Sequence, residues 1–433
     1  MSRLKLKTTS SLTDVEAEDR IMDAQEKDLA TKTSEEAQDA QNAADVPELP
    51  EVPAYINQQR AEVLRKQLTQ QPVPPEKGLI YLASFPKSGN TWTRLFLFAL
   101  FNPLARQDSN FNLSDIAGRA GQMDVTFQLF ERILGKPHYE ISDVEVAQTM
   151  PMAQKLLAVQ QEKKVFVKTH LCNGAWHGTR TIGLDTFRSA VYIVRNPLDV
   201  TPSFASHMNT DINGAIQGMA NSTHFIGGRP KKFNLEAAIK IEKEKRPELT
   251  DEEAKEKALS PGQIPQLMGS WSEHAASWTA AADPRVIYMR YEDMKHDPAD
   301  TFFRTTQHLG LPFNRDDVIA AEEAVKFDKI QAKEKKDGFR EKMGGEAFFR
   351  KGKTGSWKEE LTDQQVRQVI MNHHHQMRRF DYIPEEYKDL DEKLLKSQKQ
   401  FAMGGVVGVG RKLTYSDKLR IKRELKKKKK LQG

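Results

Sequence analysis

The sequence GLIYLASFPKSGNTWTRLFLFALF at residues 78–101 decides the fold of this chain. Its first part, up to Ala83, is short and apolar, and its last part, from Thr91, carries apolar side chains at helical spacing. The pattern predicts a strand, a tight loop at 84–92 and a helix. A loop at a helix N-terminus presents unpaired backbone N–H groups and the positive end of the helix dipole. We therefore expect this loop to bind an anion, phosphate above all.

The loop at 84–92 does not match the Walker phosphate-binding motif. That motif requires glycine directly before its lysine and again five positions earlier. Pro86 and Tyr81 occupy these two places, although Lys87 and Ser88 preserve the last two letters of the motif. The stretch is therefore interpreted as a phosphate-binding loop of another kind.

Composition limits the class of protein. The 433 residues suffice for one large domain or two ordinary ones, and a net charge of +6 indicates no particular partner. The single cysteine, Cys172, excludes an intramolecular disulfide and fits a reducing compartment. The sequence has neither an apolar run of membrane-spanning length nor the apolar stretch of a signal peptide. We therefore expect a soluble, cytoplasmic protein.

Changes of composition divide the chain into segments. Residues 1–50 are polar and acidic and are expected to be disordered, and residues 51–76 are expected to form a short helix and a linker. The globular domain is placed at 77–390. Within it, residues 226–268 are charge-rich and are expected to form a helical, largely solvated excursion, which belongs to an insertion at about 210–268. The remainder, 391–433, is a basic tail.

Four apolar runs rich in Val, Ile and Tyr are predicted to be strands, and helical stretches lie between them. They are found at 78–85, 164–170, 189–195 and 285–291. Continuous apolar strands that alternate with helices are typical of a parallel sheet covered on both faces. The sequence therefore predicts an α/β fold of three layers, with a central parallel sheet flanked by helices.

Polar side chains follow the ends of all four predicted strands. They are Lys87, Lys168 with His170, Arg195 and Tyr291. In open α/β sheets, ligands bind beyond the carboxyl ends of the strands. We therefore expect these side chains to lie around one site.

Two other motifs are interpreted structurally. The sequence NHHHQ at 372–376 suggests a metal site, but consecutive helix positions do not face one point. Trp271, His274 and Trp278 recur at helical spacing and are expected to form one packed helix face.

Five motifs in order resemble those of the cytosolic-type sulfotransferases, which transfer a sulfuryl group from 3′-phosphoadenosine-5′-phosphosulfate (PAPS) to a hydroxyl or amine. Together the motifs span roughly residues 79–383. The resemblance implies a P-loop-like fold of the three-layer kind predicted above. The motifs are FPKSGNTW from Phe85, VKTHL from Val167, YIVRNPLDVTPSF from Tyr192, MRYEDMKHDP from Met289 and FRKGKTGSWKEELT from Phe349.

By this resemblance, the catalytic residues are Lys87, Lys168, His170 and Ser203. His170 is the general base, Lys87 neutralises the bridging oxygen as the donor bond breaks, and Lys168 stabilises the transferring group. A histidine with a reference pKa of about 6.5 suits proton abstraction near neutral pH. The sulfuryl group carries less charge than a terminal phosphate, so no metal is expected.

The resemblance also implies which residues bind the donor. Trp92 stacks on the adenine and Tyr291 contacts it. The phosphosulfate is held by Lys87, Ser88, Gly89, Asn90 and Thr91, and the 3′-phosphate by Arg195, Ser203, Arg350, Lys351 and Gly352.

The acceptor is expected to be a small molecule, with the insertion at about 210–268 covering the mouth of its site. Two alternatives stay open. One is another P-loop-like nucleotide-binding protein, such as a small-molecule kinase, and the other is a catalytically silent homologue that binds 3′-phosphoadenosine-5′-phosphate (PAP). The basic tail, with contiguous Lys426 to Lys430, is expected either to be solvated or to contact anionic membrane or RNA weakly.

Overall fold

The computed structural model describes most of the predicted domain. The described residues are 53–108, 111–113, 122–123, 125–227, 235–259, 264–339, 348–349 and 352–403. The predicted disorder of residues 1–50, the last thirty residues of the basic tail, Arg350 and Lys351 lie outside them.

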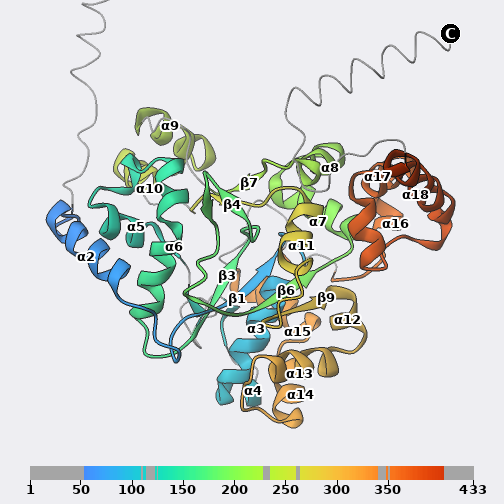
Figure 1. The fold of residues 1–433 in the computed structure, drawn as a ribbon, viewed down its shortest axis with the longest axis horizontal. Helices are drawn as coiled ribbons and strands as arrows, with labels where there is room; N and C mark the ends of the chain where they lie inside the picture. Colours follow the sequence, from blue (N-terminus) through green and yellow to red (C-terminus); the bar gives the residue numbers. More distant parts are fainter. Residues whose placement is uncertain are drawn as a thin grey trace, which may run out of the picture.

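A five-stranded, all-parallel sheet forms the centre of the molecule, in the order β2-β3-β1-β6-β9. Its four longer strands are labelled in Figure 1. The four predicted strands are confirmed, and a two-residue edge strand, β2, was not predicted. The strands are β1 (Leu79–Ser84), β2 (Gln122–Met123), β3 (Val165–Thr169), β6 (Phe187–Val194) and β9 (Val286–Arg290).

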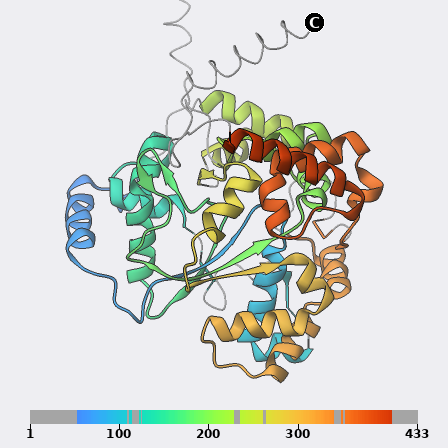
Figure 2. The ribbon, with the colours of Figure 1, turned by 45° about the vertical axis from the view of Figure 1, so that its right-hand side comes forward.

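Alternate side chains of β1 serve two hydrophobic cores, one on each face of the sheet. Tyr81 and Ala83 point to the first core, whereas Ile80 and Leu82 point to the second. Figure 2 shows helices on both faces, which is the predicted three-layer arrangement.

The first core is covered mainly by six helices. They are α5 (Phe127–Leu134), α6 (Asp143–Val159), α7 (Pro197–Met208), α8 (Ile212–Ala220), α11 (Trp271–Thr279) and α17 (Asp363–Arg379). Helices on the other face cover the second core. They are α3 (Asn90–Phe101), α4 (Pro103–Asp108), α12 (Tyr291–His296), α13 (Pro298–His308), α14 (Arg315–Ala324) and α15 (Phe327–Asp337).

The register of the sheet brings the predicted site residues to one edge. Ala83 pairs with Thr169 across β1 and β3, Ser84 pairs with Ile193, and Val194 pairs with Arg290. The neighbours β3 and β6 lie on opposite sides of β1, and this is the kind of switch point at which α/β sheets bind ligands.

The predicted charge-rich insertion is helical where it is described. It contains α9 (Leu235–Lys245) and α10 (Asp251–Leu259), and short strands β7 (Phe225–Ile226) and β8 (Gln266–Leu267) close its base. These strands pair antiparallel, with Phe225 opposite Leu267. The insertion is therefore a helical excursion with a narrow, hydrogen-bonded neck.

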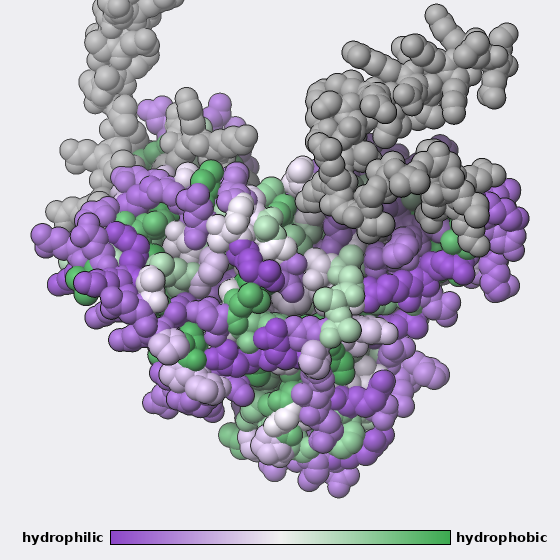
Figure 3. Space-filling view, viewed as in Figure 1, coloured by the Kyte–Doolittle hydropathy of each residue, from purple (hydrophilic) through white to green (hydrophobic). Residues whose placement is uncertain are grey.

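Helices also border the domain on the side of each terminus. Before β1 lies α2 (Gln58–Gln70), and after α17 lies α18 (Lys388–Met403), which extends into the predicted tail. A short helix, α16 (Trp357–Glu360), precedes α17, and this flank of the surface is predominantly hydrophilic (Figure 3). Among the described helices, none is both long and apolar enough to cross a membrane.

Candidate active site

The loop between β1 and α3 has a backbone that only a few residues adopt easily. Lys87 has φ +66° and Gly89 has φ +108°. A Cβ atom on Gly89 would lie 2.8 Å from Cδ2 of Tyr291, so glycine is required both by φ and by this close approach. Gly89 is also the N-cap of α3 and offers no side-chain cap to that helix.

Two polar side chains of the loop are buried with unsatisfied atoms. Asn90 Nδ2 donates to Leu82 O (2.9 Å) and to Ser84 Oγ (3.2 Å), which ties the start of α3 to β1. Within the described residues, Asn90 Oδ1 and the hydroxyl of Ser88 have no hydrogen-bond partner. A buried hydroxyl without a partner is costly, and a bound anion would satisfy it.

Arg195 joins the loop to a second segment, residues 352–357. Its Nη1 donates to Lys87 O and its Nη2 to Lys353 O, both at 3.1 Å. The guanidinium carbon lies 4.4 Å from the centre of the Tyr291 ring, and the buried Nε has no partner among the described residues. The Nε–H of this cation is thus available to an anion at the junction of the two segments.

Asp199 holds the segment 352–357 in place. Its buried carboxylate accepts hydrogen bonds from Gly355 N (2.8 Å), Trp357 N (3.1 Å) and the Ser356 hydroxyl (3.2 Å). Asp199 lies in the first turn of α7 and the predicted Ser203 in its second turn. The start of α7 therefore positions the segment expected to contact the 3′-phosphate.

Aromatic rings lie beside Arg195. The Trp92 ring meets Tyr291 edge to face at 6.1 Å between centroids, and its N–H donates to Val325 O (3.1 Å). Gly352 has φ +57° and lies against the ring of Phe327, which leaves no room for a Cβ atom. The predicted adenine contacts, Trp92 and Tyr291, thus come together with the predicted phosphate contact Gly352.

His170 lies directly after β3, and two hydrogen bonds fix it. Its Nδ1 is 2.6 Å from the carbonyl oxygen of Ser84. Because a carbonyl only accepts, Nδ1 must carry the hydrogen, and Nε2 is then the basic nitrogen of the neutral ring. The backbone N–H of His170 donates to Gln266 Oε1 at 2.7 Å.

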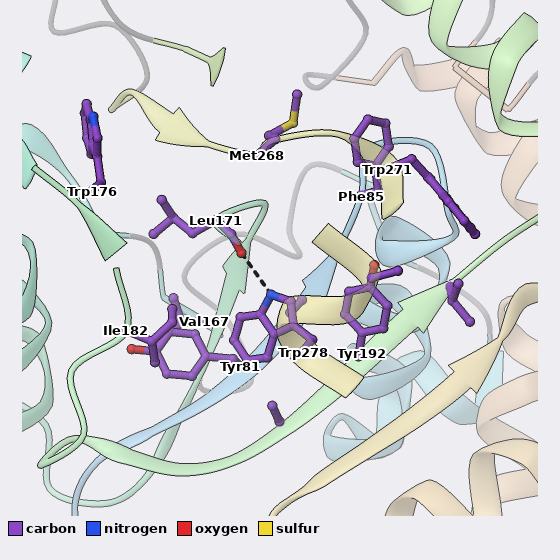
Figure 4. Packing of buried hydrophobic residues seen from close by; sticks show 14 of the residues in the cluster. Tyr81, Phe85, Val167, Leu171, Trp176, Ile182, Tyr192, Met268, Trp271 and Trp278 are labelled. Atoms are coloured by element: carbon purple, nitrogen blue, oxygen red, sulfur yellow. Dashed lines mark hydrogen bonds between the residues drawn. The ribbon is translucent and has the colours of Figure 1, made fainter. Parts of the chain in front are cut away.

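A chain of buried, hydrogen-bonded side chains ends at the backbone carbonyl of His170. His274 Nε2 donates to His170 O (3.1 Å) and the Tyr192 hydroxyl donates to His274 Nδ1 (3.0 Å). Burial lowers the pKa of His274 to about 4, so its ring is neutral. Trp278 donates from its indole N–H to Leu171 O at 2.9 Å, drawn as a dashed line in Figure 4. The predicted packed face of α11 is confirmed, and its side chains hydrogen-bond to the chain that follows β3.

A cavity of about 510 Å³ opens beside Lys168 and His170. Its walls combine the end of β3, the helices α5 and α6, the strand β8 and Tyr55, which precedes α2. The lining residues beyond β3 are Tyr55, Tyr81, Val125, Thr126, Phe127, Gln128, Glu131, Met150, Gln154, Ile264 and Gln266. Sequence patterns did not predict that these residues line one cavity, because they are scattered through strands, helices and loops and share no motif.

Glu131 is the one acidic side chain among the lining residues. It accepts hydrogen bonds from Tyr55 Oη (2.8 Å) and His138 N (3.0 Å), and its Oε1 lies 2.7 Å from His138 Nδ1. Burial acts to raise the pKa of Glu131, but these hydrogen bonds outweigh it and hold the pKa below its ordinary value. The wall therefore contains a carboxylate that is already held by protein groups.

The histidine run at 372–376 forms no common site. His373 Nδ1 lies 3.0 Å from Ser272 Oγ, whereas His374 Nε2 lies 2.6 Å from Asp391 Oδ1. Within the part of the chain that is described, no three His, Cys, Asp or Glu side chains are placed to hold a metal ion. That the reaction needs no metal stays a prediction.

Comparisons with known proteins identify the family of this chain. The model of the sulfotransferase domain matches residues 78–381. The chain is 23% identical to the flavonol 3-sulfotransferase of Flaveria bidentis over 70% of its own length and 83% of that protein. It is 25% identical to cytosolic sulfotransferase 10 of Arabidopsis thaliana over 69% and 77% of the two chains. A mouse sulfotransferase, SULT7A1, solved with PAP, is 19% identical over 78% of this chain and 95% of that chain, with a TM-score of 0.41.

The family match defines the class of protein, an α/β transferase that acts on a sulfuryl group. The chain belongs to the sulfotransferase domain family, whose model covers the whole sheet and the site at its edge.

Proposed function

We propose that this enzyme transfers a sulfuryl group from PAPS to a hydroxyl, or an amine, of a small molecule that binds in the 510 Å³ cavity. One observation carries the proposal. His170 lines that cavity, and its Nδ1 is bonded to the carbonyl of Ser84, the first residue of the loop at 84–92. The proposed base thus lies between the expected donor loop and the cavity proposed for the acceptor.

The donor fits the residues that surround the loop. Ser88 Oγ and Arg195 Nε are two buried atoms that can donate hydrogen bonds, and both lack partners among the described residues. Anionic oxygens would satisfy both of them. We assign the 5′-phosphosulfate to the loop and the 3′-phosphate to Arg195 and the segment around Gly352. The proposed donor contacts are Lys87, Ser88, Gly89, Asn90, Thr91, Trp92, Arg195, Ser203, Tyr291, Arg350, Lys351 and Gly352.

Each catalytic residue then has one task. Nε2 of His170 takes the proton from the acceptor hydroxyl. It is the basic nitrogen of the ring, because Nδ1 carries the hydrogen that is donated to Ser84 O. Lys87 opposes the charge that develops on the leaving phosphate oxygen. Lys168, which lines the cavity, stabilises the group in transfer, and Ser203 holds the 3′-phosphate end.

The proposal is tested by the affinities for PAP and AMP, which differ by the 3′-phosphate. Charged hydrogen bonds contribute roughly 1.5–3 kcal/mol each, so PAP should bind at least about a hundredfold more tightly. Arg195→Ala should remove much of this difference, whereas Arg304→Ala, on an exposed helix face, should leave it unchanged. Equal affinities of the wild-type protein for PAP and AMP, measured by calorimetry, would refute PAPS as the donor.

Two further assays distinguish the alternatives from this proposal. A small-molecule kinase should be stabilised by ATP with magnesium more than by PAP in a thermal shift. A catalytically silent homologue should bind PAP but transfer no label from radioactive PAPS to any acceptor in an extract of its own cells.

A further inference from the structure

Strand β8 at the neck of the insertion lies along the chain that follows β3. Cys172 N donates to Leu267 O at 2.8 Å. Beside this bond, His170 N donates to Gln266 Oε1. On its other side, Met268 N donates to His224 O at 2.9 Å. Gln266 is thus held between the insertion and the strand end that carries the base.

The orientation of the Gln266 amide follows from its partner. A backbone N–H can only donate, so the group that faces His170 N must be the carbonyl oxygen of the side chain. The Thr169 hydroxyl lies 3.4 Å from the same oxygen. The NH₂ group therefore faces away from the His170 backbone. Gln266 is half-buried and lines the cavity, and no hydrogen bond to its Nε2 is found within the described residues.

We propose that Gln266 serves the reaction from both ends of its amide. The oxygen holds the backbone of His170 and so positions the base, and the NH₂ group donates a hydrogen bond to an oxygen of the acceptor. The oxygen is fixed to the backbone N–H of His170, and Gln266 lines the cavity in which the acceptor is proposed to bind. We infer that favoured acceptors carry a second oxygen in addition to the reacting hydroxyl. This inference rests on the proposed function of the site.

Two substitutions separate the two ends. Gln266→Leu removes both hydrogen bonds, whereas Gln266→Glu keeps an oxygen for His170 N but replaces the donor by an acceptor. In the PAP complex, hydrogen exchange of the His170 amide should quicken at least about tenfold in the leucine variant and stay within about threefold of wild type in the glutamate variant. Gln368→Leu, on the exposed face of α17, is the matched control.

Turnover tests the acceptor end with phenol and with two diols, catechol and resorcinol, as probes. The wild-type enzyme should favour at least one diol over phenol in kcat/KM by about tenfold. Gln266→Glu should lose this preference through a higher KM, and Gln266→Leu should lose kcat as well. Unchanged exchange at His170 in Gln266→Leu would overturn the positioning role. A preference for a diol over phenol that survives in Gln266→Glu, or is absent from the wild type for both diols, would overturn the acceptor role.

The outcomes remain distinct from a failure of the proposed function. If PAP does not bind the wild-type protein, the donor assignment is wrong whatever Gln266 does. If PAP binds and the Gln266 variants bind it equally well, the two measurements above decide this inference alone.

Discussion

At the scale of single residues, the chemistry of the site depends on which atoms already form hydrogen bonds within the protein. The sequence and its resemblance to known sulfotransferases predicted that His170 is the base. Neither predicted that Ser84 O would fix its tautomer, because that contact joins two strands 86 residues apart. The same contact explains why a histidine at a strand end can be a base as well as a packing residue.

His170→Ala should slow transfer by roughly 10²–10⁴-fold, because general base catalysis contributes that much. PAP affinity should change little, since the substituted ring belongs to the acceptor side. Rates with a hydroxyl acceptor and calorimetry with PAP measure the two quantities, and His308→Ala, which is exposed, is the control. Near-normal rates in His170→Ala would remove this residue from the mechanism.

At the scale of elements, helix α7 and the segment 352–357 form one unit through Asp199. In the sequence, Asp199 and Arg195 belong to one motif. The resemblance assigned that motif and the motif from Phe349 to the same 3′-phosphate. Neither predicted the carboxylate that joins them, because a buried aspartate in a helix has no distinctive spacing. Parallel strands, by contrast, were predictable, since each is a continuous apolar run.

Asp199→Asn should weaken PAP binding by about tenfold and leave AMP binding nearly unchanged. The asparagine amide keeps one oxygen as an acceptor, but its NH₂ group then faces one of the N–H or O–H donors of the segment 352–357. About one hydrogen bond that holds this segment near the 3′-phosphate is therefore lost. Calorimetry with both nucleotides measures this, with the exposed Asp316→Asn as control. An equal loss for PAP and AMP would show that Asp199 does not act through that segment.

The chain before β1 contributes Tyr55 to the wall of the cavity beside His170, although it precedes the matched domain at 78–381. The Tyr55 hydroxyl donates a hydrogen bond to Glu131. Burial, and to a smaller extent Glu131, raise the pKa of this phenol to about 12. Tyr55→Phe should therefore raise the acceptor KM severalfold, with kcat and PAP affinity unchanged, in steady-state assays. Val63→Ala, at an exposed position of α2, is the control, and an unaltered KM in Tyr55→Phe would show that the hydroxyl does not shape the cavity.

At the scale of the whole molecule, buried neutral histidines make stability depend on pH. Burial lowers the pKa of both His274 and His373 to about 4. The unfolded chain takes up these protons near pH 6.5 and the folded chain only near pH 4, so stability is full above about pH 6.5 and declines as the pH falls toward 4. Each histidine should account for about 3 kcal/mol of this decline.

His373→Gln should make the decline shallower, by about 2–3 kcal/mol between pH 7 and pH 4.5. Urea unfolding at a series of pH values measures the free energy of unfolding, and the change with pH is compared rather than its absolute value. His308→Gln should leave the slope as in the wild type, because that side chain is exposed. A slope unaffected by His373→Gln would mean that this ring already takes up its proton in the folded protein.

The paired strands at the neck of the insertion have a consequence for how this enzyme can diversify. Once Phe225 and Leu267 are joined, the entropy of closing the excursion grows only slowly with its length, by about 0.6 kcal/mol for each doubling. Helices α9 and α10 can thus be lengthened, shortened or exchanged at small cost to the domain, while β8 keeps its hold on the strand end. The neck makes the excursion a replaceable module, which can change without rebuilding the edge of the sheet that carries His170.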